Sequence, residues 1–259
     1  MPAVHSGCVP HFGWWRPFAH FLARDYRVAT MSWSGMGRSD WRDKYTSDQL
    51  LREAGRVGET AGLFDAGAEP VMVAHSFGGF LAIRAAVSWA DRLQGVVFVD
   101  SRLRPRRVWG DDAAPALPSN IYRTRANAIR RFRLQPPQPE TNQFYLDMLA
   151  EEALVEVEGG WTWRSDPAMR NKIELGGDII ALIGQARCEL AFIRGEKSTS
   201  VTDEIWATRS CLQTYPVIPA HRVRVRRKTL ATAGPGLGSS AGVSRRCWNL
   251  KGDGGPGRI

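Results

Sequence analysis

The sequence has few cysteines and no long apolar run. Its four cysteines, Cys8, Cys188, Cys211 and Cys247, are widely separated and show no paired ligand spacing, so neither a disulfide framework nor a zinc site is indicated. No stretch approaches the roughly 20 apolar residues that a membrane span needs, and the N-terminus lacks the basic-then-apolar order of a signal peptide. We therefore expect a cytoplasmic protein without a metal or a membrane partner.

Acidic residues are scarce at the C-terminal end. Residues 222–259 hold nine basic residues against the single acid Asp253, so this segment carries eight of the nine net positive charges. It also has eight glycines and little hydrophobic periodicity, which predicts a disordered tail. A basic arm for nucleic acid is the alternative, but the segment lacks the interleaved aromatic residues of a single-strand binder, and we expect no nucleic-acid partner.

Short apolar runs alternate with longer segments of helical periodicity along the first 221 residues. This alternation predicts an α/β fold, a mostly parallel sheet flanked by helices. The interval 102–186 interrupts this alternation: it has six prolines between positions 105 and 139, followed by amphipathic stretches, and we interpret it as a helical cap insertion. We expect residues 1–101 to form the first segment of the core, 102–186 the cap, 187–221 the second segment of the core and 222–259 the tail. Strands are expected at 2–5, 26–33, 70–75, 93–99, 188–193 and 216–218, and helices at 14–24, 47–62, 78–90 and 202–211.

The most informative local pattern surrounds Ser76. An apolar run ends at Ala74 and His75, and a helical pattern begins at Gly78. A serine raised on a sharp strand-to-helix turn needs small residues two positions away on either side, and Ala74 and Gly78 meet that need. We predict that Ser76 is a nucleophile and that the backbone N–H of Phe77 donates to a developing oxyanion. An ordinary turn serine is the alternative.

Taken in order, these and further motifs resemble the α/β-hydrolase superfamily, in particular its capped serine hydrolases of the esterase and carbon-carbon hydrolase type. The resemblance covers about residues 2–221 and identifies the chain as a member of that superfamily. The motifs that carry it are His5-Ser6-Gly7, Trp14-Trp15, Ser34-Gly35-Met36-Gly37-Arg38-Ser39-Asp40, the Ser76 turn, Phe98-Val99-Asp100 and Arg194-Gly195-Glu196-Lys197-Ser198.

The resemblance implies a nucleophile, an acid and a histidine in that chain order. His221 is the one histidine after Ser76 and is the implied general base, unless it belongs to the tail. At the position where this superfamily usually carries the acid, the sequence has Ser198. The candidates for the acid are therefore Asp100 and Glu196, which lies near the usual position. We favour Asp100, because the end of a core strand fixes a side chain better than a loop does; the alternative is that it only caps a turn.

For the oxyanion hole, the resemblance adds the Gly7 amide as second donor beside Phe77. The implied activity is hydrolysis of an ester, a thioester or an activated carbon-carbon bond in a small-molecule substrate, through an acyl-enzyme on Ser76 and without a cofactor. The competing hypothesis is a catalytically impaired or inactive product, truncated or frame-shifted. It is motivated by the apparent absence of the first family strands and by a basic tail in place of the closing amphipathic helix. Oligomeric state is not predicted.

Overall fold

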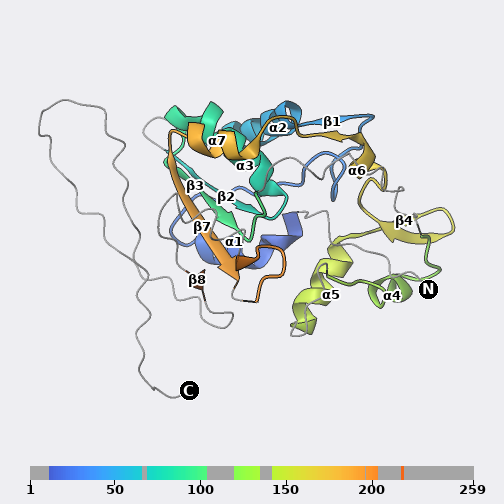
Figure 1. Cartoon of the computed structure of the whole chain (residues 1–259). Helices are drawn as coiled ribbons and strands as arrows, with labels where there is room; N and C mark the ends of the chain where they lie inside the picture. Colours follow the sequence, from blue (N-terminus) through green and yellow to red (C-terminus); the bar gives the residue numbers. More distant parts are fainter. Residues whose placement is uncertain are drawn as a thin grey trace, which may run out of the picture.

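The computed structural model describes residues 12–65, 69–103, 120–134, 142–195, 197–203 and 217–218 (Figure 1). Several predicted features therefore lie outside the described residues. They are the strand at 2–5, most of the helix at 202–211, the tail and three of the candidate site residues, Gly7, Glu196 and His221.

A four-stranded parallel sheet forms the centre of the molecule, as the sequence predicts. Its order is β2-β3-β7-β8, and every neighbouring pair is parallel. His75 of β2 lies opposite Val99 of β3, which in turn lies opposite Ile193 of β7. The residues that follow these strands therefore meet at one edge of the sheet. The bounds are β2 Val71–His75, β3 Gly95–Val99, β7 Glu189–Gly195 and β8 Val217–Ile218.

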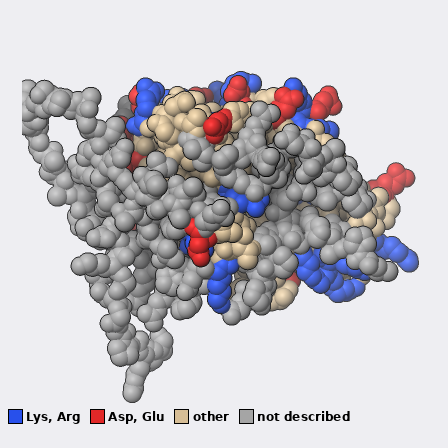
Figure 2. All heavy atoms as spheres, in the orientation of Figure 1, with Lys and Arg blue, Asp and Glu red and all other residues tan. Residues whose placement is uncertain are grey.

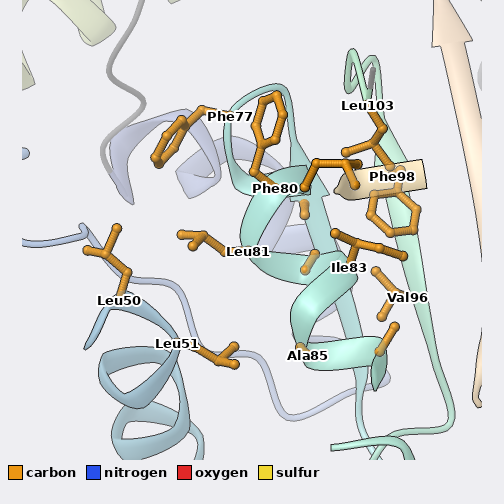
Figure 3. Close-up of a cluster of buried hydrophobic side chains, with 14 of the residues drawn as sticks. Leu50, Leu51, Phe77, Phe80, Leu81, Ile83, Ala85, Val96, Phe98 and Leu103 are labelled. Atoms are coloured by element: carbon orange, nitrogen blue, oxygen red, sulfur yellow. The ribbon is translucent and has the colours of Figure 1, made fainter. Parts of the chain in front are cut away.

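Helix α3 is the centre of the hydrophobic core. Its residues are almost all apolar and Leu81, Ala82, Ile83, Ala85 and Ala86 are fully buried, because the helix packs against β2 and β3, α2 and α7. Figure 3 shows Leu81 directed toward α2 and Ile83 toward β3. The helix bounds are α1 Arg16–Leu22, α2 Ser47–Thr60, α3 Gly78–Ser88 and α7 Ile179–Gln185, with short 3-10 turns η1 at Phe12–Trp14 and η2 at Ala90–Arg92.

A second, smaller hydrophobic cluster lies apart from this core. It is built by two helices and an antiparallel hairpin, which Figure 1 shows beside the sheet rather than on it. The predicted insertion is therefore mixed rather than purely helical, in part because Gly159 and Gly160 adopt positive φ angles that close a tight hairpin turn. The elements are α4 Arg125–Ile129, α5 Gln143–Glu152, β4 Leu154–Val157 and β5 Gly160–Trp163; the buried residues are Ala128, Phe132, Leu149, Ala150, Leu154 and Trp163.

The last portion of the predicted insertion packs differently. Met169, Ile173, Ile179 and Ile183 join the main core instead of the smaller cluster. In this portion, β6 pairs in parallel with β1, and α7 packs on α3. An amphipathic pattern predicts that a helix face is buried but not which partner buries it. The bounds are α6 Met169–Lys172, β6 Ile173–Glu174 and β1 Tyr45–Thr46.

The predicted strand at 26–33 is wrong. Residues 27–33 form no regular element, and none of the described strands pairs with them. A strand is maintained by its ladder of hydrogen bonds to a neighbour, so an apolar run alone does not create one. Instead this segment leads into turns in which Ser39 Oγ donates to Ser32 O at 2.7 Å.

No helix in the described ranges is long and apolar enough to cross a membrane. On the face shown in Figure 2, acidic and basic side chains are interspersed over the upper part of the molecule.

A buried polar cluster joins β1 to the segment before α6. The Tyr45 hydroxyl donates to Asp166 Oδ2 at 2.7 Å and accepts from the Arg42 N–H at 3.0 Å. Asp166 also accepts from Lys172 Nζ and from the Ala168 N–H, both at 2.9 Å. Burial, supported by the Asp166 carboxylate, raises the pKa of Tyr45 to about 12. Burial alone would raise the pKa of Asp166, but its three donors outweigh burial and hold that pKa below its usual value.

Substitution of Tyr45 by phenylalanine tests the contribution of this cluster. Tyr45 is fully buried, so removal of its hydroxyl leaves the Arg42 N–H without this acceptor and Asp166 with one donor fewer. We expect the free energy of unfolding to fall by about 1–3 kcal/mol, measured by urea denaturation. The matched control is Tyr26→Phe, whose side chain is 71% exposed and which should leave stability unchanged. Equal midpoints for Tyr45→Phe and the wild type would contradict the prediction.

Candidate active site

Ser76 occupies a strained turn between β2 and α3. Its φ angle is +49°, in the left-handed region that a non-glycine residue rarely adopts. The Ser76 N–H donates to Val99 O at 3.0 Å, which continues the β2–β3 ladder by one residue. Its carbonyl accepts from the Gly79 N–H at 3.1 Å, and α3 starts at Gly78. The local structure is thus the sharp strand-to-helix turn that the sequence predicts.

Small residues on both sides of Ser76 allow this turn to close. A Cβ added at Gly78 would lie 3.6 Å from Ala74 Cβ, which is an ordinary van der Waals contact. A Cβ added at Gly79 would lie only 2.6 Å from both Cβ and Oγ of Ser101. The sequence indicated the flanking positions 74 and 78, but the tighter restriction is at 79, where α3 approaches the end of β3. The Gly78-Gly79 pair is the one signal in the sequence that could have revealed the restriction at position 79.

The two glycines give a matched pair of variants. Gly78→Ala should leave stability unchanged or raise it slightly, because alanine favours the helix by about 1 kcal/mol and its Cβ fits. Gly79→Ala should lower the free energy of unfolding by about 1–3 kcal/mol, since Ser101 must move to admit the Cβ. Thermal unfolding of both variants measures the difference. Equal stabilities would show that α3 and Ser101 separate easily.

Asp100 follows β3 as Ser76 follows β2. It too has a positive φ angle, +45°, and its N–H donates to Ile193 O at 2.7 Å. Asp100 and Ser76 are the two non-glycine residues with positive φ in the part of the chain that the structure describes. Because His75 lies opposite Val99, the two residues follow adjacent strands at the same edge of the sheet. Backbone strain of this kind concentrates at functional sites.

The two oxygens of the Asp100 carboxylate have different surroundings. Oδ2 accepts from Ser198 Oγ at 2.9 Å. Oδ1 is buried and has no hydrogen-bond partner within the described ranges. Ser198 occupies the position where the resemblance places the usual acid, and it contacts Asp100, the substitute that we favour over Glu196. Sequence reasoning did not predict this contact.

His75, the residue before Ser76, stacks on Trp14 of η1. Their rings stack with centroids 5.9 Å apart and an interplanar angle of 24°. Burial lowers the pKa of His75, while the negative charge of Asp100 opposes that shift. The Trp14 carbonyl accepts from the Tyr145 hydroxyl of α5 at 2.9 Å. Through these contacts the smaller cluster is connected to the turn that holds Ser76.

The remaining candidates are described less completely. The Phe77 side chain is buried, and its ring lies 6.3 Å from that of Phe80. The oxyanion role of its N–H stays a prediction, as do the roles of Gly7, Glu196 and His221, which are outside the described residues. Among the side chains that are described, no group of three or more His, Cys, Asp or Glu gathers in a way that could hold a metal ion.

Comparisons with known proteins agree with this architecture. A model of the alpha/beta hydrolase family matches residues 3–232. A comparison with curated protein sequences finds no match.

Three solved structures illustrate the similarity in fold. A thioesterase domain from the curacin biosynthetic pathway has a TM-score of 0.65 at 20% identity, and the match covers 83% of each chain. An E-2-(acetamidomethylene)succinate hydrolase has a TM-score of 0.63 at 19% identity, over 83% of this chain and 80% of the hydrolase. An esterase from Mycobacterium tuberculosis has a TM-score of 0.59 at 20% identity, over 83% and 74%. At these identities the likeness establishes the fold.

Proposed function

We propose, since the chain belongs to the alpha/beta hydrolase family, that it is a serine hydrolase whose nucleophile is Ser76. Its substrate would be a small molecule with an ester, a thioester or an activated carbon-carbon bond. The observation that carries this proposal is the positive φ of Ser76 at the junction of β2 and α3. A strained backbone at this junction holds a hydroxyl above the end of the sheet, where a substrate can reach it.

The reaction would proceed through an acyl-enzyme. Ser76 Oγ attacks the carbonyl carbon while its proton passes to His221, because a serine hydroxyl is too weakly acidic to react unaided. Negative charge develops on the carbonyl oxygen, and the N–H groups of Phe77 and Gly7 would stabilise it. The leaving group takes the proton from His221. Water then attacks the acyl-enzyme with His221 as base, which releases the acid and restores Ser76.

We further propose Asp100 as the acid that orients His221. The support is the state of its carboxylate: one oxygen is held by Ser198, and Oδ1 is buried without a partner in the described part of the chain. A buried, unpaired carboxylate oxygen is costly, so a donor that approaches Oδ1 is favoured. The second N–H of an imidazole is such a donor. Glu196 remains the competing candidate for this role.

The smaller cluster would act as a cap over Ser76. We propose that the cap comprises about residues 120–163 and that residues from Met169 onward belong with the main core. The support is the chain of contacts from Tyr145 of α5 through Trp14 to His75, the residue before Ser76. The many aromatic side chains of the cluster would suit an apolar acyl group or an aromatic ring. Among the structural neighbours are a thioesterase domain and an esterase, in agreement with a thioester or ester as the bond that is cleaved.

Covalent labelling tests the nucleophile directly. The 259-residue chain is treated with a fluorophosphonate probe, and the modified residue is mapped by mass spectrometry. Labelling of Ser76 in the folded protein, but not after heat denaturation, supports the proposal. The absence of folded-state labelling would instead favour the alternative, a member of the family that is catalytically impaired.

A further inference from the structure

We infer that Ser198 is a positioning residue that fixes the Asp100 carboxylate and leaves Oδ1 as the oxygen available to the catalytic base. The inference rests on the proposed function, because it takes Asp100 as the acid. It goes beyond that proposal by assigning a role to a hydroxyl at a position where a carboxylate was expected.

The hydrogen bonds of the Ser198 hydroxyl determine which acceptor receives its proton. Its Oγ accepts from the Val201 N–H at 3.0 Å and lies 2.9 Å from Asp100 Oδ2. A hydroxyl has a single proton to donate, and a carboxylate can only accept. Because Val201 supplies a donor, the Ser198 proton is directed to Asp100. Such a bond to an ionised group is stronger than one between neutral groups.

The loop that carries Ser198 is itself anchored to the core. The Ser198 N–H donates at 3.0 Å to the carbonyl oxygen of Gly195, the last residue of β7. Val201 is 1% exposed, and Arg194 forms an ion pair with Asp203 at the far side of the loop. Three different contacts therefore hold the hydroxyl in place before any substrate binds.

The backbone of Asp100 is held in the same way. Its N–H is bonded to Ile193 O, and its φ of +45° restricts the side chain to a few orientations. With Oδ2 bonded to Ser198, the remaining freedom of the carboxylate is lost and Oδ1 faces one direction. Without Ser198, partial rotation about χ2 would tilt the carboxylate plane and move the acceptor oxygen away from an approaching imidazole. Ser198 therefore acts on the reaction through Asp100 and not by contact with the substrate.

Kinetics of Ser198 variants test this role. For hydrolysis of p-nitrophenyl acetate by the full chain, Ser198→Ala should lower kcat about 10–100-fold with KM unchanged, as is typical for the loss of a supporting hydrogen bond. Ser198→Thr keeps the hydroxyl and should recover most of kcat. In an Asp100→Asn background, Ser198→Ala should have no further effect. Thr199→Ala, an exposed neighbour in the same loop, is the matched control and should resemble the wild type.

Two kinetic results would overturn the inference: an unchanged kcat in Ser198→Ala, or an effect that persists in full in the Asp100→Asn background. Crystal structures of the wild type and Ser198→Ala provide a test that is independent of activity. The Asp100 carboxylate should keep one orientation in the wild type and rotate or split in the variant, and an identical carboxylate in both would also overturn the inference. Failure of the proposed function has a different signature, the absence of labelling at Ser76 in the wild type.

Discussion

Replacement of Ser76 by alanine is expected to lower kcat/KM for p-nitrophenyl acetate by at least about 10³-fold. The hydroxyl is the group that forms the acyl-enzyme, and an alanine methyl group at the end of β2 cannot do so. The same variant should lose labelling by a fluorophosphonate probe. Ser88→Ala, at the exposed end of α3, is the matched control and should retain full activity. Ser76→Ala with activity near that of the wild type would contradict a serine nucleophile at this position.

A second variant separates the role of the hydroxyl from the strain of the backbone. Ser76 adopts a φ of +49°, which glycine accepts without cost and alanine does not. Ser76→Gly should therefore be inactive, like Ser76→Ala, yet more stable than it by about 1 kcal/mol. Thermal unfolding of the two variants measures this difference. If Ser76→Gly is the more stable variant, the protein tolerates backbone strain at position 76 in order to hold the serine hydroxyl there.

Substitution of Asp100 by asparagine is expected to lower kcat by about 10³–10⁴-fold, because an amide cannot stabilise the imidazolium that forms during proton transfer. Asparagine has nearly the shape of aspartate and tolerates positive φ, so the fold should be retained. Its amide oxygen can still accept from Ser198. Circular dichroism and the midpoint of urea unfolding check that the variant is folded.

Glu196→Gln is the matched comparison, since Glu196 is the competing candidate for the acid. We expect it to keep most of the wild-type kcat. The reverse pattern, a silent Asp100→Asn and an inactive Glu196→Gln, would move the acid to the loop after β7. The pair of variants therefore decides between the two candidates in one assay.

Part of the fold could be predicted because the responsible signals are local. The runs at 70–75, 93–99 and 188–193 are apolar and bounded by turn residues, and the structure confirms them as β2, β3 and β7. The helix expected from Ser47 starts there because the Thr46 side chain accepts from the Gln49 N–H. Elements of this kind depend mainly on residues within a few positions of one another.

Other expectations failed because the structure of a segment depended on which other segment of the chain packs against it. The apolar run at 26–33 does not form a strand, because none of the described strands pairs with it. The segment around Ile179 and Ile183 packs in the main core and not in the smaller cluster, although the sequence placed it in the insertion. A pattern of apolar residues specifies a buried face, and only the packed structure specifies what covers it.

The candidate site likewise has features that local sequence determines and features that depend on long-range contacts. The sequence by itself determined the strand, the turn and the helix around Ser76, because the small residues that permit a positive φ there are its near neighbours. Only the tertiary structure decided that Asp100 meets Ser198, which is 98 positions away, and that Gly79 meets Ser101. The physical reason is that φ and ψ respond to adjacent residues, whereas contacts between side chains depend on the pairing and register of strands. In this protein the parallel register of β2, β3 and β7 brings Ser76 and Asp100 to one edge of the sheet.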